Sequence, residues 1–336
     1  MTVAIILGGG APNLTLMSGA LAALEERKAR FSAIAASGAG MLVALLYAAP
    51  KGMTPAEALK STKNMGVSDE IYRWFSINFK VFHKPGLLAD QFRKTIDPYL
   101  GLLPQDSPTA QFVHDWFRLV AATFTPSDLS PTSQGLCAAA PWIEDAVDFD
   151  KLKAAPYDFY LNAFNLAERK MRTFEKNEIT ASHFRAALAF PFLYSPFMLD
   201  GDPYIEGSAV DTFNFEALLK DRQIYKRGPI KTLVVFDVLG FDKILHAPNS
   251  LYDAWVQSIM VPLVSMAKDD LKIFEREHER KYPIKLEKIK FDEGQIVWPE
   301  VLDWSRSNLS RLYDVGYKAG ADFYDQHRKL FSDHSA

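Results

Sequence analysis

The sequence predicts an α/β fold, with a central, mainly parallel sheet and helices on both of its faces. Two observations indicate this class. Within the first fifty residues an apolar strand, a helix, a second apolar strand and a second helix follow one another. That βαβ order implies two parallel strands joined by a right-handed crossover. A further apolar strand at 231–236 comes late in the chain. With 336 residues and 48 % hydrophobic content, the chain can bury one large core.

The first elements follow from apolar spacing. Val3–Leu7 is apolar on both faces, as expected of a fully buried strand. A helix is predicted over 13–30, where leucines and a methionine recur at helical spacing before a charged end. Phe31–Ala36 reads as the second strand, and Gly40–Ala49 as the helix that follows it.

The remaining elements are placed in the same way. Residues 54–103 are predicted to be mostly helical. Residues 104–148 are rich in Pro, Ser, Thr and Ala yet also carry aromatic side chains. They are interpreted either as an insertion or lid packed over the core, or as an ordinary helical excursion. The later elements are predicted as a strand at 157–165 with a hairpin partner at 170–174, a helix at 179–188, a strand entering a turn at 204–207, the strand at 231–236, and helices at 249–280 and 309–330. With no repeat or linker, we expect one domain over 1–336.

Charge and cysteine content exclude some classes. The formal net charge of −3 gives no electrostatic reason to expect a nucleic-acid partner. A single cysteine cannot form an internal disulfide. The first residues lack the basic stretch of a signal peptide, and no apolar run reaches the length of a membrane span. We therefore expect a cytoplasmic protein.

Two turns of small residues carry the chemical signal. Gly8, Gly9 and Gly10 follow the first strand, where bare amides at a helix N-terminus can hold an oxyanion or a phosphate. Ser37-Gly38-Ala39-Gly40 connects the second strand to its helix, which is the strand–turn–helix geometry that exposes a serine nucleophile. Together they predict serine acyl chemistry with a backbone oxyanion hole.

A dinucleotide site is the competing interpretation of the glycines. In a G-x-G-x-x-G motif the third glycine would fall at position 13, which is Asn13. No acidic residue ends the strand at 31–36 to bind a ribose. The sequence therefore disfavours this site, and we expect no cofactor and no metal.

In order along the chain, these motifs resemble those of patatin-like phospholipases. The resemblance covers the glycine-rich segment, the serine turn, an Ala-rich segment at 186–191 and the run from Tyr204 to Asp211, which is similar to the family's D-G-[GA] motif. It implies a three-layer patatin-like fold and a Ser-Asp dyad. It also implies an acyl lipid or ester substrate, with transient contact at the surface of a membrane or lipid body.

The chain departs from the family pattern around this site. Gly38 stands at the nucleophile position, with Ser37 one residue earlier, and its flanking glycines become Ala36 and Gly40. Glu206 replaces the aspartate, and Ser208 replaces the glycine of that motif. After the three glycines, the family's arginine and glycine become Pro12 and Asn13.

Two interpretations follow. In the first, the Ser37 hydroxyl attacks the carbonyl carbon, Glu206 accepts its proton, and the amides of Gly8–Gly10 bind the oxyanion. In the second, Ser37 only caps the next helix, and the protein is a catalytically silent lipid-binding or scaffold protein.

Other candidates are weaker. His183 could complete a triad but is better interpreted as a local group at a helix start, and Asp211 is expected to stabilise its loop. A set of aromatic residues is interpreted as core, with an acyl-chain tunnel or lipid-facing surface as the alternative. The set comprises Trp74, Phe75, Phe79, Phe82, Trp116 and Phe117.

Overall fold

One mixed, mostly parallel sheet organises the α/β fold of the computed structural model, which describes residues 3–10, 13–221, 230–236, 238–239, 244–278, 284–292 and 303–331. The strand order is β10-β9-β1-β2-β4-β8-β7, and β5 also pairs with β4. The five strands from β10 to β4 are parallel, and those beyond them are antiparallel. The strands are β1 (Val3–Leu7), β2 (Ala33–Ala36), β4 (Asp158–Asn165), β5 (Lys170–Glu175), β7 (Phe197–Leu199), β8 (Asp202–Glu206), β9 (Thr232–Phe236) and β10 (Lys285–Ile289).

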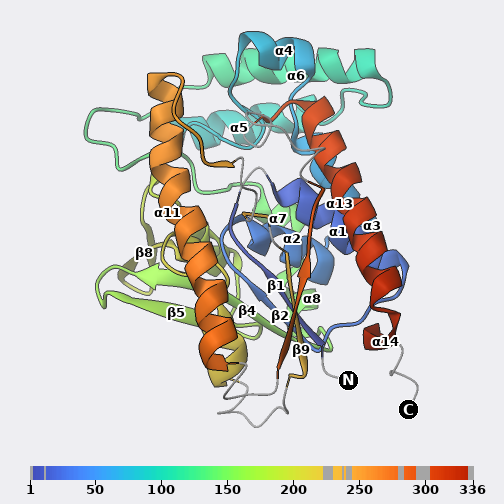
Figure 1. Cartoon of the computed structure of the whole chain (residues 1–336). Helices are drawn as coiled ribbons and strands as arrows, with labels where there is room; N and C mark the ends of the chain where they lie inside the picture. The colour runs from blue at the N-terminus through green and yellow to red at the C-terminus, as the bar shows by residue number, and fades with distance from the viewer. Residues whose placement is uncertain are drawn as a thin grey trace.

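Helices cover both faces of this sheet. α1 (Leu14–Glu26) joins β1 to β2, and α11 (Leu251–Ile273) joins β9 to β10, in opposite directions along the strand order. Right-handed crossovers therefore place these two helices on opposite faces. α13 (Arg306–Gln326) packs closely along α1, and in Figure 1 α11 and α13 flank the sheet. A Cβ atom at Gly316 of α13 would overlap the carbonyl oxygen of Leu16, so glycine permits this close packing.

Three further helices form a cap at one end of the molecule, at the top of Figure 1. They are α4 (Asp69–Trp74), α5 (Leu87–Leu100) and α6 (Pro108–Phe124). The shorter elements are α2 (Ala39–Ala48), α3 (Pro55–Ser61), η1 (Thr62–Met65), α7 (Ile143–Ala146), α8 (Phe149–Lys153), α9 (Ala181–Ala187), η2 (Gly207–Ala209), η3 (Ala217–Asp221), η5 (Phe274–His278), α14 (Arg328–Phe331) and a small parallel pair, β3 (Gly135–Cys137) with β6 (Phe192–Tyr194).

The register of β4 brings distant segments together. β5 pairs with residues 160–165 of β4 along one edge, so β2 and β8 share the other edge. On that edge Ala36, the last residue of β2, pairs with Leu161, and Glu206, the last residue of β8, pairs with Ala163. The chain leaving β2 therefore runs directly beside Glu206.

Most predicted elements are confirmed, including the parallel β1–β2 pair and the β4–β5 hairpin. The helix predicted over 249–280 ends outside the described residues. The sequence did not predict β10, which lies at the sheet edge and has three charged residues among its five. Among the described helices, none combines the length and the apolar character that crossing a bilayer requires.

Candidate active site

The three glycines after β1 form one wall of the site. The Gly8 carbonyl accepts a hydrogen bond from the Gly40 amide at 3.1 Å, which ties the glycine turn to the start of α2. A Cβ atom at Gly40 would overlap this carbonyl oxygen, so only glycine allows the approach. In the part of the chain that the structure describes, the amides of Gly9 and Gly10 have no backbone acceptor, which suits them to bind an oxyanion. Pro12 lies outside the described residues.

Gly38 has the backbone of a nucleophile turn without a side chain. It is the N-cap of α2, with φ 51° and ψ −135°, a left-handed conformation that favours glycine. A Cβ atom here would overlap Oε1 of Glu206 and lie 2.5 Å from Oγ of Ser208. The nucleophile position therefore points straight at the carboxyl group, as the family resemblance implied, but carries no hydroxyl.

Glu206 is a buried carboxylic acid at the end of β8. Its amide donates to the Ala189 carbonyl at 3.0 Å, and its side chain is nearly inaccessible to solvent. Burial raises the pKa of Glu206 to about 7, although the hydrogen bond from Ser208 opposes the rise. The Ser208 hydroxyl, two residues later in η2, donates to Oε1 of Glu206. A carboxyl group with this pKa can exchange protons near neutral pH.

Ser37 belongs to a different hydrogen-bond network. Its hydroxyl donates to Oδ1 of Asn162 at 2.7 Å and lies 3.1 Å from the Asp211 carbonyl oxygen. The structure thus does not join Ser37 to Glu206, which accepts its hydrogen bond from the Ser208 hydroxyl. The alternative that Ser37 caps α2 is wrong, because the N-cap is Gly38 and no side chain makes a cap hydrogen bond there. The nucleophilic role of Ser37 stays a prediction.

The other candidates have local roles. His183 Nδ1 lies 2.9 Å from the Thr180 hydroxyl, at the start of its own helix. Asp211 accepts a hydrogen bond from the Asn214 amide at 2.8 Å, so it does stabilise its loop, and burial raises its pKa. No group of three or more His, Cys, Asp or Glu side chains among the described residues could hold a metal ion.

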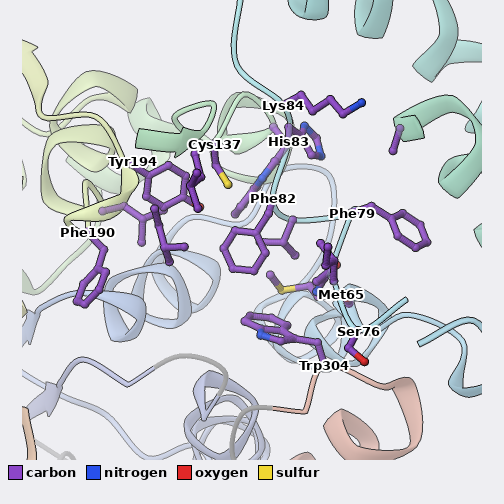
Figure 2. A pocket seen from close by; sticks show the side chains of 18 of the residues that line it. Met65, Ser76, Phe79, Phe82, His83, Lys84, Cys137, Phe190, Tyr194 and Trp304 are labelled. Carbon is purple, nitrogen blue, oxygen red and sulfur yellow. Dashed lines mark hydrogen bonds between the residues drawn. The ribbon is translucent and has the colours of Figure 1, made fainter. Parts of the chain in front are cut away.

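A large cavity of about 1150 Å³ opens onto this site. Gly10, Glu206 and Ser208 lie on its wall, and most of the remaining lining is apolar. Figure 2 shows Tyr194 and Phe190 on one side of this space, with Phe82 and Trp304 on another. Its volume slightly exceeds the roughly 300–1,000 Å³ of common ligand pockets.

The predicted aromatic set is not core. Phe75, Phe79 and Phe82 line the cavity. Trp74 is 81 % exposed, and Trp116 and Phe117 are about half exposed on the cap. The core interpretation is therefore wrong for these residues, because α4, α6 and the irregular segment that follows α4 form a wall over a cavity instead of packing onto the sheet.

Sequence reasoning missed the roles of Ser208 and Asn162. Ser208 was noted only as a departure from the family pattern, yet its hydroxyl is the one that contacts Glu206. The sequence did contain a signal: compared with the family pattern, the chain has glycine in place of serine at position 38 and serine in place of glycine at position 208. Asn162 is a buried amide inside the apolar strand β4, a pattern that indicates a specific polar partner.

Comparisons with known proteins agree with the sequence motifs. The family model of the patatin-like phospholipases matches residues 5–219. No curated protein matches the chain closely enough to count as a relative.

Among solved structures, VipD from Legionella pneumophila aligns with 97 % of this chain and 67 % of its own length, at 13 % identity and a TM-score of 0.42. The type III effector protein ExoU aligns with 97 % of this chain and 53 % of its own, at 13 % identity and a TM-score of 0.38. ExoU in its heterodimeric complex with SpcU, from Pseudomonas aeruginosa, aligns with 97 % and 51 %, at 13 % identity and a TM-score of 0.36. The chain thus spans about two thirds of VipD and about half of ExoU.

Proposed function

Because this chain belongs to the patatin-like phospholipase family, we propose that it is a serine-dependent lipid acyl hydrolase of the phospholipase or carboxylesterase type. One observation carries the proposal. A buried carboxyl group, Glu206, accepts a hydrogen bond from a serine hydroxyl, and both line a large apolar cavity beside a turn of glycine amides. This arrangement supplies a nucleophile, a proton acceptor and oxyanion donors in one place.

The roles follow from the chemistry of ester hydrolysis. Glu206 accepts the proton of the attacking hydroxyl, which requires its ionised form. The amides of Gly8, Gly9 and Gly10 stabilise the negative charge on the carbonyl oxygen of the tetrahedral intermediate. Neither step needs a cofactor.

The cavity supports an acyl lipid as the substrate class. Its apolar walls reach from Glu206 to the cap, so an acyl chain can lie along them while its carbonyl group meets the glycine turn. Residues of 104–148 contribute to this wall, among them Leu119, Leu136 and Trp142. This placement supports their proposed role as a lid, and exposed apolar side chains on the cap support transient contact with a lipid surface.

A fluorophosphonate probe and an ester series test the function. We expect intact-mass detection of one covalent adduct, and hydrolysis of p-nitrophenyl esters that improves as the acyl chain lengthens. Glu206→Gln should lower kcat/KM by roughly 10²–10⁴-fold. Glu168→Gln, a change to an exposed glutamate in the β4–β5 hairpin, is the matched control and should have no effect.

Gly38 favours one alternative, a catalytically silent lipid-binding protein. The usual nucleophile position has no hydroxyl, so the cavity could hold an acyl chain without reaction. Folded protein that binds a fluorescent fatty acid but forms no adduct, and turns over no ester, would establish this alternative and refute the hydrolase.

A further inference from the structure

Among the residues that the structure describes, the serine hydroxyl in contact with the carboxyl group of Glu206 is that of Ser208. The Ser208 side chain donates to Oε1 of Glu206, and both residues line the cavity. Ser37 is absent from the cavity lining and has hydrogen-bond partners elsewhere. Contact with both the base and the substrate space therefore distinguishes Ser208 from Ser37.

Ser208 occupies the space that a side chain at residue 38 would need. A Cβ atom at Gly38 would lie 2.5 Å from the Ser208 hydroxyl and 3.0 Å from its Cβ atom. A Cβ atom at Gly9 would lie 2.7 Å from the same hydroxyl. The Ser208 hydroxyl is thus enclosed by the nucleophile turn, the glycine turn and Glu206, and glycine at both neighbouring positions gives it room.

We propose that Ser208 is the nucleophile of this enzyme, and that the reactive hydroxyl has been exchanged between the turn at residue 38 and the turn at residue 208. This inference rests on the proposed acyl hydrolysis and assigns its serine. The glycine at 38 and the serine at 208 reverse the arrangement that the family pattern implies. The carboxyl group of Glu206 stays at the position of the family's aspartate, and the hydroxyl that contacts it comes from Ser208, in the turn that directly follows Glu206.

The reaction balances with water as the only co-reactant. The Ser208 hydroxyl transfers its proton to Glu206 as Oγ bonds to the acyl carbon, and the amides of the Gly8–Gly10 turn bind the resulting oxyanion. The carbon–oxygen bond to the alcohol then breaks, and Glu206 returns the proton to the leaving oxygen. Water next gives a proton to Glu206 and its hydroxide to the acyl carbon. The bond to Oγ breaks, Oγ regains the proton, and the fatty acid leaves.

Peptide mapping of the fluorophosphonate adduct tests the assignment. We expect the adduct on Ser208 in the wild-type protein, and its loss in Ser208→Ala together with a fall of at least 10³-fold in ester turnover. Ser37→Ala should still be labelled on Ser208. Ser18→Ala is the matched control, because Ser18 is a buried serine of α1 whose hydroxyl has no partner among the described residues. Circular dichroism melting of each variant separates loss of reactivity from loss of folding.

A second, independent measurement uses variants that move the serine back from position 208 to position 38. Gly38→Ser alone should lose labelling, because its side chain would overlap Glu206 and crowd Ser208. Combining it with Ser208→Gly removes the crowding hydroxyl and gives the flexible end of the Glu206 side chain room to move aside, so the adduct should move to residue 38.

The outcomes separate the two proposals. An adduct on Ser37, or undiminished labelling of folded Ser208→Ala, would overturn the role of Ser208 and leave the hydrolase intact. Wild-type protein with neither adduct nor turnover would overturn the hydrolase itself.

Discussion

At the scale of single residues, the ionisation of Glu206 governs the proposed chemistry. Its carboxyl group is buried and accepts a hydrogen bond from the Ser208 hydroxyl. Burial favours the neutral acid and raises the pKa to about 7. The neighbouring Tyr194 has its own pKa raised by burial, so it stays neutral across the same range. Ester turnover should therefore rise with pH around 7, as the carboxylate forms.

The same pKa predicts how stability depends on pH. An ordinary glutamate titrates near 4.5, so between 4.5 and about 7 the native protein holds a proton that the unfolded chain has released. The free energy of unfolding should fall as pH rises through this window. Between pH 4.5 and pH 8, the free energy of unfolding of the wild type should fall by roughly 3 kcal/mol more than that of Glu206→Gln.

Urea unfolding of both proteins at several pH values measures this difference. Asp211 and Asp270 also have pKa values raised by burial, but both proteins carry them, so their contribution cancels. A difference in unfolding free energy that does not change with pH would show that Glu206 titrates normally.

The sequence predicted which residues form the site better than it predicted the role of each residue. Gly8–Gly10, Gly38 and Glu206 do meet, because their motifs follow strand ends that the sheet brings together. In the turn after β2, a side chain at residue 38 would meet Glu206, whereas the serine stands one residue earlier and its hydroxyl contacts Asn162 instead. Local spacing cannot specify such a choice, since it is made by side-chain contacts between distant strands.

At the scale of elements, the attachment of α6 decides whether the cavity keeps its wall. Asp115 of α6 is buried and receives hydrogen bonds from the Ser68 amide and hydroxyl, both at 2.8 Å. Lys80 Nζ lies 2.9 Å from its other oxygen, and the His114 ring lies 3.3 Å away. Burial alone would raise the pKa of Asp115, but these partners outweigh it and lower the pKa far below its usual range.

Removing this carboxylate should destabilise the cap. Asp115→Ala would leave the buried Lys80 ammonium without its carboxylate partner, so we expect a loss of roughly 3–5 kcal/mol in the free energy of unfolding. Asp150→Ala is the control, because its ion pair with Lys153 is exposed and should contribute less than about 1 kcal/mol. Chemical denaturation measures both. Equal losses in the two variants would contradict a structural role for the buried pair.

Helices and strands with a clear apolar pattern in their own sequence were predicted well. A strand that forms only because it pairs with a neighbouring strand was not predicted. β1, α1 and β9 have apolar runs long enough to define them alone. β10 has only two apolar residues, Leu286 and Ile289, and is a strand because it pairs with β9. The aromatic residues from Trp74 to Phe117 were predicted to be core because a segment that covers an apolar cavity has the same apolar composition as a segment of the core.

At the scale of the whole molecule, the cavity and the apolar surface of the cap are continuous. Phe75 and Ile77 line the cavity and are also 50 % and 68 % exposed. The cap helices and the turn after α5 expose further large apolar side chains: Trp74, Leu87, Leu88, Leu102, Trp116, Phe117 and Phe124. Apolar side chains that continue from the surface into an acyl-sized cavity suit a lipid bilayer, from which a substrate can enter without crossing water.

This surface predicts binding to neutral phosphatidylcholine vesicles. Replacing Trp74 and Trp116 together by serine should weaken binding in co-sedimentation by roughly tenfold or more, since each lost apolar contact costs on the order of 1 kcal/mol. Met198→Ser, which changes an exposed methionine on β7, should bind like the wild type. Because the contact is apolar, raising the salt concentration should not release the protein, whereas a charge-driven contact would weaken. Release by salt, or an equal loss in Met198→Ser, would show that the cap is not the membrane-binding surface.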